Sequence, residues 1–229
     1  MVDLFPTQIV WHLAPKMSND HYGDYIKQLD GALETVWHDT LCIHIASDAS
    51  APTKGALQAL LVALVFQGGT RIANIVVAGG HAMAPNAELM VLEMSIATTL
   101  AVGCSTLVCF MDSIVAMNTL VDPSPHSGQG SSLAACMALW NWFSGDQHRI
   151  LHLWHVPSKE EWKIHHDTQI LLCPSCRTSF DFAWAAKEVE YQKEWHKAFA
   201  DPGNWGRGFL KLVGLNRKPL KPMSMKGGA

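Results

Sequence analysis

Two short apolar runs, each followed by an aspartate, constrain this chain more than any other feature of its sequence. The first run covers residues 41–47 and precedes Asp48, and the second covers residues 106–111 and precedes Asp112. Continuous apolar runs of this length are typical of buried strands. A carboxylate at the end of such a strand faces the crevice in which α/β sheets bind their ligands. We therefore expect an α/β fold in which both aspartates lie at a ligand-binding edge.

The segments around these two runs predict a mixed sheet. Residues 67–70 have turn chemistry and residues 72–78 are rich in β-branched side chains, so the ambiguous segment 56–66 is best interpreted as the first strand of a hairpin. A last strand is predicted at 150–156. Its two histidines, His152 and His155, are an odd number of residues apart and should face opposite sides, so they form no joint ligand pair. Helices are predicted at 22–37, 86–102, 113–120, 131–143 and 160–172. This order predicts a five-stranded mixed sheet with helices on both faces.

Composition and charge divide the chain into three parts. Of the 229 residues, 48% are hydrophobic and 16% are charged, which excludes a disordered polyelectrolyte. We expect an N-terminal linker at 1–40, the main domain at 41–172 and a basic, partly helical C-terminal extension at 173–229. No Lys or Arg occurs between Arg71 and Arg149, whereas residues 177–229 carry ten of the 17 basic residues. If the protein binds nucleic acid, we expect the extension to neutralise much of the phosphate charge.

The sequence shows no signal for a membrane or for secretion. The N-terminus lacks a basic region followed by an apolar one, and polar residues interrupt the longest apolar stretch. The six cysteines form no regular framework, so we expect a soluble intracellular protein with reduced thiols, in the cytoplasm or the nucleus. Cys173 and Cys176 have the spacing of zinc ligands, but no second pair follows, and we interpret them as thiols at a helix end.

A third acid, Glu88, lies in the first turn of the helix predicted at 86–102 and completes a candidate site with Asp48 and Asp112. Three neighbouring carboxylates repel one another unless cations bind between them, and Mg²⁺ or Mn²⁺ prefers such oxygen ligands. Two ions about 3.5–4 Å apart can activate a water and stabilise the leaving oxygen of a phosphodiester. Taken singly, each acid is also explained by a turn, a helix cap or the helix dipole.

The motifs around these acids occur in one order along the chain: Ser47-Asp48-Ala49-Ser50, Ala87-Glu88-Leu89 and Met111-Asp112-Ser113. In this order they resemble the type 1 ribonuclease H domain, and more narrowly the ribonuclease H-like domains that accompany reverse transcriptases in fungal retroelements. The resemblance covers roughly residues 41–172 and includes the segments 126–129 and 156–159.

This resemblance implies a metal-dependent nuclease that hydrolyses the RNA strand of RNA–DNA hybrids by a two-metal-ion mechanism. It implies that Asp48 bridges both ions and that Glu88 and Asp112 each complete the shell of one ion. The family's fourth carboxylate corresponds to Asp167, although another alignment places Gln169 there.

The chain also departs from the family pattern, because Lys159 stands in the loop that carries a histidine in family members. The alternative function is therefore a catalytically degenerate ribonuclease H fold that serves as a structural or nucleic-acid-docking module. The resemblance further implies a polymerase or reverse transcriptase module of the same element as a protein partner.

Overall fold

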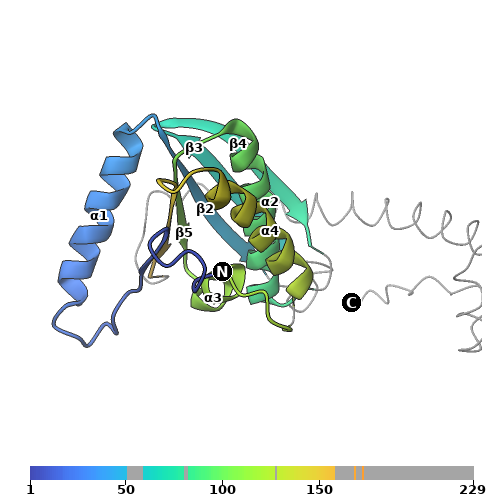
Figure 1. Ribbon diagram of the computed structural model, residues 1–229. Coiled ribbons are helices and arrows are strands. Elements are labelled where there is room, and N and C mark those ends of the chain that lie inside the picture. Colours follow the sequence, from blue (N-terminus) through green and yellow to red (C-terminus); the bar gives the residue numbers. More distant parts are fainter. Residues whose placement is uncertain (51–58, 80–81, 127, 158–167, 169–171, 173–229) are drawn as a thin grey trace, which may run out of the picture. The chain divides into compact units, whose positions relative to one another are not determined.

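The computed structural model describes residues 1–50, 59–79, 82–126 and 128–157, together with Thr168 and Leu172 (Figure 1). Within these residues, six strands form one mixed sheet in the order β1-β6-β5-β2-β3-β4. The strands are β1 (Ile9–His12), β2 (Cys42–Ser50), β3 (Leu60–Gln67), β4 (Thr70–Ala78), β5 (Thr106–Met111) and β6 (Ile150–His155). β1, β6, β5 and β2 pair in parallel, and β3 is antiparallel to both β2 and β4.

The predicted hairpin is confirmed as β3 and β4. The segment 56–66, whose sequence is compatible with either a helix or a strand, contains most of β3. Every residue from Leu60 to Phe66 is buried. Gly68, in the turn, has a φ of 54°, a left-handed conformation that glycine adopts without steric penalty.

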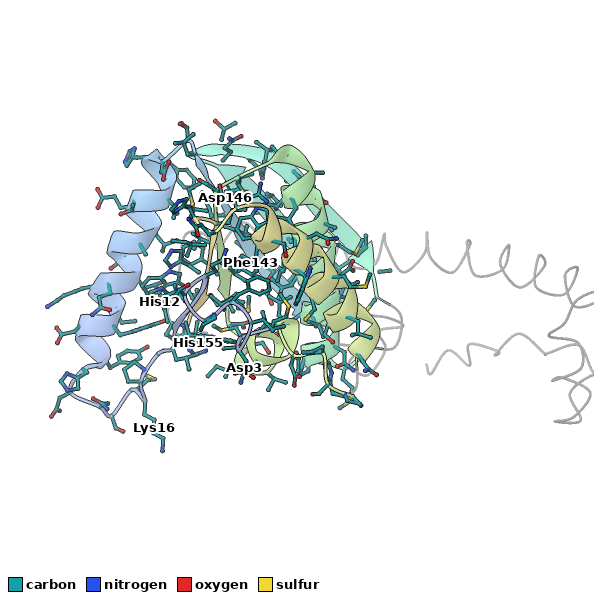
Figure 2. All side chains as sticks on the ribbon, viewed as in Figure 1. Asp3, His12, Lys16, Phe143, Asp146 and His155 are labelled. Carbon is teal, nitrogen blue, oxygen red and sulfur yellow. The ribbon has the colours of Figure 1, made fainter. Side chains whose placement is uncertain are left out.

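The expectation of five strands is wrong, because β1 adds a sixth strand from the segment 1–40. That segment is therefore not a linker outside the domain. β1 pairs with β6, with Ile9 opposite Leu151 and His12 opposite Trp154. Tyr25 lies in the helix that follows β1, and its hydroxyl is 2.9 Å from the His12 carbonyl and 2.6 Å from the His155 carbonyl. These contacts connect the ends of β1 and β6 to that helix. Figure 2 shows His12 and His155 close to each other.

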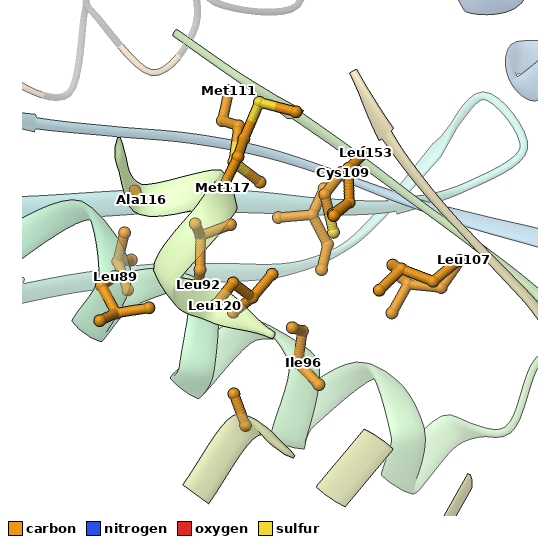
Figure 3. Packing of buried hydrophobic residues seen from close by; sticks show 14 of the residues in the cluster. Leu89, Leu92, Ile96, Leu107, Cys109, Met111, Ala116, Met117, Leu120 and Leu153 are labelled. Atoms are coloured by element: carbon orange, nitrogen blue, oxygen red, sulfur yellow. The ribbon is translucent and has the colours of Figure 1, made fainter. Parts of the chain in front are cut away.

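Helices cover both faces of the sheet, as predicted (Figure 1). The described helices are α1 (Tyr22–His38), α2 (Ala84–Val102), α3 (Ile114–Leu120) and α4 (Gln129–Gly145). α1 packs on one face, where Leu29 and Val36 join a cluster with Phe110 of β5. α2, α3 and α4 pack on the other face and enclose the larger core. Figure 3 shows part of this core, in which Leu92 and Ile96 of α2 approach the side chains of β5 and α3.

Several predictions fall wholly or partly outside the described residues. Among them are Asp167, Gln169 and Lys159, and the entire extension 173–229 with Cys173 and Cys176. Of the helix predicted at 160–172, the structure describes Thr168 and Leu172, and the Leu172 amide donates to the Thr168 carbonyl at 3.1 Å, the spacing of one helical turn. None of the described helices has the length and apolarity that crossing a lipid bilayer requires.

Candidate functional site

The register of β2 and β5 places Asp48 and Asp112 at the same edge of the sheet. The two strands run in parallel, and their last paired residues are Ala46 and Phe110. Asp48 and Asp112 each follow two residues later, so the two aspartates lie next to each other just beyond the last paired residues of β2 and β5. Asp112 comes directly after β5 as predicted, whereas Asp48 lies within β2, which continues to Ser50.

Glu88 reaches this edge from α2. β4 runs in the same direction as β2, since each is antiparallel to β3, and the chain therefore enters α2 from the edge that holds the aspartates. α2 begins at Ala84, so Glu88 lies one turn into the helix and not in its first turn as the sequence predicts. The Ser113 hydroxyl lies close enough to the Glu88 carboxyl to lower its pKa. That hydroxyl also accepts the Ala116 amide at 3.2 Å, as the N-cap of α3.

The sequence did not identify Ser113 as a partner of Glu88. The Met111-Asp112-Ser113 motif contained the signal, because a serine directly before a short helix is a favoured N-cap. The capped turn between β5 and α3 places both the Ser113 hydroxyl and Asp112 near Glu88 of α2.

Burial and mutual repulsion raise the pKa values of two of the three acids. Burial raises the pKa of Asp48 to about 6, and the Asp112 carboxylate adds to the increase. The pKa of Glu88 is raised to about 7, mainly by burial and further by Asp112 and Asp48, although the nearby Ser113 hydroxyl acts in the opposite direction. The three acids therefore influence one another electrostatically, which is the condition that a bound cation relieves.

Two carboxyl oxygens at this edge are buried without a hydrogen-bond partner in the described part of the chain. These are Oε2 of Glu88 and Oδ1 of Asp112, whereas Oδ1 of Asp48 accepts the Ala49 amide at 2.7 Å. An unpaired buried carboxyl oxygen is energetically unfavourable, and a divalent cation is a partner of the right chemistry.

The same three acids do not form a preassembled metal site. Among the described residues, no three His, Cys, Asp or Glu side chains are placed to hold one ion together. The three acids therefore offer a hard cation the right kind of ligand, buried carboxylate oxygens. To bind one ion together, their side chains would have to move closer to one another. The structure does not describe Asp167, the fourth expected ligand.

His155 is a neighbour of the site that sequence reasoning missed. It ends β6 opposite Met111, and its Nε2 lies 3.2 Å from the Asp112 carbonyl oxygen. Burial lowers the pKa of His155, and the hydrogen bond to Asp112 partly offsets this. His152 contacts His12 instead, with 3.1 Å between Nδ1 and Nε2, consistent with the prediction that the two histidines of β6 form no joint pair. No local signal in the sequence distinguishes His155 from His152, because its contact with Asp112 depends on the pairing of β6 with β5.

No family model matches this chain, and no curated protein matches it. Among solved structures, it is similar to the N-terminal RNase H domain of a Mycobacterium tuberculosis protein fused to maltose-binding protein, with 20% identity and a TM-score of 0.42, covering 52% of this chain and 88% of that chain. RNase H1 from Halobacterium salinarum has 16% identity and a TM-score of 0.39, over 52% of this chain and 87% of that one. LC11-RNase H1 in complex with an RNA/DNA hybrid has 15% identity and a TM-score of 0.40, over 51% and 86%.

Proposed function

We propose that this chain is a metal-dependent nuclease of the ribonuclease H type, which hydrolyses the RNA strand of RNA–DNA hybrids. The observation that supports this most is the convergence of Asp48, Glu88 and Asp112 at one edge of the sheet, with two raised pKa values and two unpaired buried oxygens. The order of the three sequence motifs adds support. The retroelement association and the polymerase partner rest on that sequence resemblance alone.

In this proposal, Asp48, Glu88 and Asp112 hold two Mg²⁺ or Mn²⁺ ions, with Asp167 as the fourth ligand. When bound, such ions supply an activated water and stabilise the leaving oxygen. The Ala49 amide orients the carboxyl of Asp48, and the Ser113 hydroxyl lies near that of Glu88. Because a cation favours the ionised carboxylate, binding releases protons from these two acids and weakens as the pH falls.

The second candidate function is a ribonuclease H-type fold without catalysis, which docks nucleic acid or a protein. Two observations favour it. The described residues contain no preassembled group of three metal ligands. In addition, the span between Arg71 and Arg149 lacks basic residues that could bind phosphates.

The test measures cleavage of an end-labelled RNA–DNA hybrid by the full chain in Mg²⁺ or Mn²⁺. Asp48→Asn and Asp112→Asn should each reduce cleavage at least about 100-fold, the scale of losing a group that stabilises the transition state, and should leave the fold intact. Asp146→Asn is the matched control, because Asp146 precedes β6 at the opposite edge of the sheet and its carboxyl accepts the His148 amide, a role that Asn can retain.

The two-metal mechanism would be excluded if both site variants retained more than about a tenth of the cleavage of the unaltered chain, because the mechanism predicts a much larger loss. Hybrid binding without cleavage by the unaltered chain would favour the docking module. Asp167→Asn tests the fourth ligand: a comparable loss assigns it, and unchanged cleavage indicates a site without it.

A further inference from the structure

We propose that His155 is a positioning residue of the candidate site, which fixes the backbone of Asp112 through its imidazole. The proposal rests on the proposed function, since it concerns how the same site holds its cation. His155 belongs to strand β6, whereas the sequence resemblance points to the loop around Lys159. The contact of His155 with Asp112 therefore follows from the geometry of this chain.

The contact extends the pairing of β5 and β6 by one residue. The last paired residues of the two strands are Met111 and His155, and the Val156 amide donates to the Met111 carbonyl at 2.7 Å. The next carbonyl along the chain is that of Asp112, and the His155 side chain reaches it with 3.2 Å between Nε2 and the oxygen. The imidazole therefore fixes the first residue beyond β5, which is the residue that carries the site carboxylate.

The chemistry of this contact determines the tautomer of His155. A carbonyl oxygen can only accept a hydrogen bond, so Nε2 carries the proton and donates it. Nδ1 then has a lone pair, and this atom is buried without a hydrogen-bond partner among the described residues. An apolar side chain at this position could pack without leaving a buried nitrogen unpaired. The unpaired nitrogen therefore favours a role for the imidazole beyond filling space.

His155 is itself held from the other side. Its backbone carbonyl lies 2.6 Å from the hydroxyl of Tyr25, which comes from α1. The connection thus runs from α1 through the end of β6 to Asp112. Oδ1 of Asp112 has no hydrogen-bond partner within the described residues, so the placement of that carboxyl depends on its backbone. Loss of the imidazole should loosen Asp112 and weaken cation binding.

The experiment compares His155→Leu, which removes the donor, with His155→Gln, which retains a donor nitrogen at a similar distance from the backbone. The readouts are the Mn²⁺ concentration that gives half-maximal thermal stabilisation without nucleic acid, and the Mn²⁺ concentration for half-maximal hybrid cleavage. We expect His155→Leu to raise both at least about tenfold, the lower end for losing a group that orients a metal ligand, with less change in cleavage at saturating Mn²⁺. His155→Gln should restore most of the affinity.

His152→Leu is the matched control, because His152 lies on the same strand and contacts His12 away from Asp112. It should leave both Mn²⁺ concentrations unchanged. Tyr25→Phe, which removes the hydroxyl that contacts the His155 and His12 carbonyls, is the second variant if His155→Leu fails to fold, and it should shift both Mn²⁺ concentrations in the same direction.

Three outcomes would overturn the inference. If His155→Leu and His155→Gln change the Mn²⁺ concentrations equally, or if neither His155→Leu nor Tyr25→Phe changes them, His155 has no positioning role, and the proposed function stands. If Mn²⁺ neither stabilises the unaltered chain nor supports its cleavage of the hybrid, the proposed function and this inference fail together.

Discussion

Replacement of Glu88 by glutamine should stabilise the metal-free protein above pH 7 and have little effect near pH 5. The pKa of Glu88 is raised from an ordinary value of 4.5 to about 7. The folded state therefore holds the proton more tightly than the unfolded chain does, and ionisation between these pH values destabilises the fold. At 1.36 kcal/mol for each pKa unit, the full penalty is about 3 kcal/mol. Glutamine does not ionise, so the variant is free of this ionisation penalty.

The assay is urea unfolding of the unaltered chain and the Glu88→Gln variant at pH 5 and pH 8 in the presence of a chelator. At pH 8 the variant should be more stable by up to about 3 kcal/mol, and at pH 5 the difference should fall below about 1 kcal/mol, because little of the ionisation penalty has developed there. Glu34→Gln, at an exposed glutamate of α1, controls for the substitution itself.

Added Mg²⁺ should stabilise the unaltered chain more than the variant, because the cation relieves the same repulsion that glutamine removes. An equal stability difference at both pH values would refute the electrostatic explanation. So would a variant that is less stable than the unaltered chain at pH 8.

Two further predictions concern the core and the extension. His44 is fully buried, it stacks on Phe66 with 5.0 Å between ring centroids, and neither of its ring nitrogens has a hydrogen-bond partner among the described residues. His44→Phe should therefore stabilise the fold by about 1–3 kcal/mol at pH 7. Because burial lowers the pKa of His44 from 6.5 to about 4, the unaltered chain should lose stability as the pH falls between these values, and urea unfolding at pH 7 and pH 5 should show a smaller loss for the variant. Truncation after Leu172 should weaken hybrid binding and flatten the dependence of log affinity on log salt, by about 0.9 for each lost phosphate contact on a duplex. An unchanged slope with a lower melting temperature would show that the extension only supports the domain.

The central strands, and the positions of Asp48 and Asp112 near their ends, could be predicted because each depends on a local pattern. β2 and β5 are apolar runs that the sequence marks without knowledge of their neighbours, and Asp48 and Asp112 follow from them. β1 could not be predicted in this way. It has four residues, of which only Ile9 is buried, and it is a strand because β6 lies beside it.

The contact of His155 also depends on long-range register. The sequence shows two histidines on one strand and gives no reason to prefer either. Only the pairing of β6 with β5 places His155 beside Asp112, and only the pairing with β1 places His152 beside His12. Contacts between strands that are distant in sequence therefore lie beyond what periodicity can indicate.

The pairing of β1 with β6 has a consequence for where this domain can be cut. The apolar pattern alone suggests a fragment that starts at residue 41, directly before β2. Such a fragment would lack β1, so the backbone groups of β6 that pair with it would form an open edge, which is a template for association with other chains. It would also lack α1, and Phe110 and Trp154 would lose the side chains of Leu29 and Val36 that cover them. An expressible form of this domain therefore has to begin before Ile9.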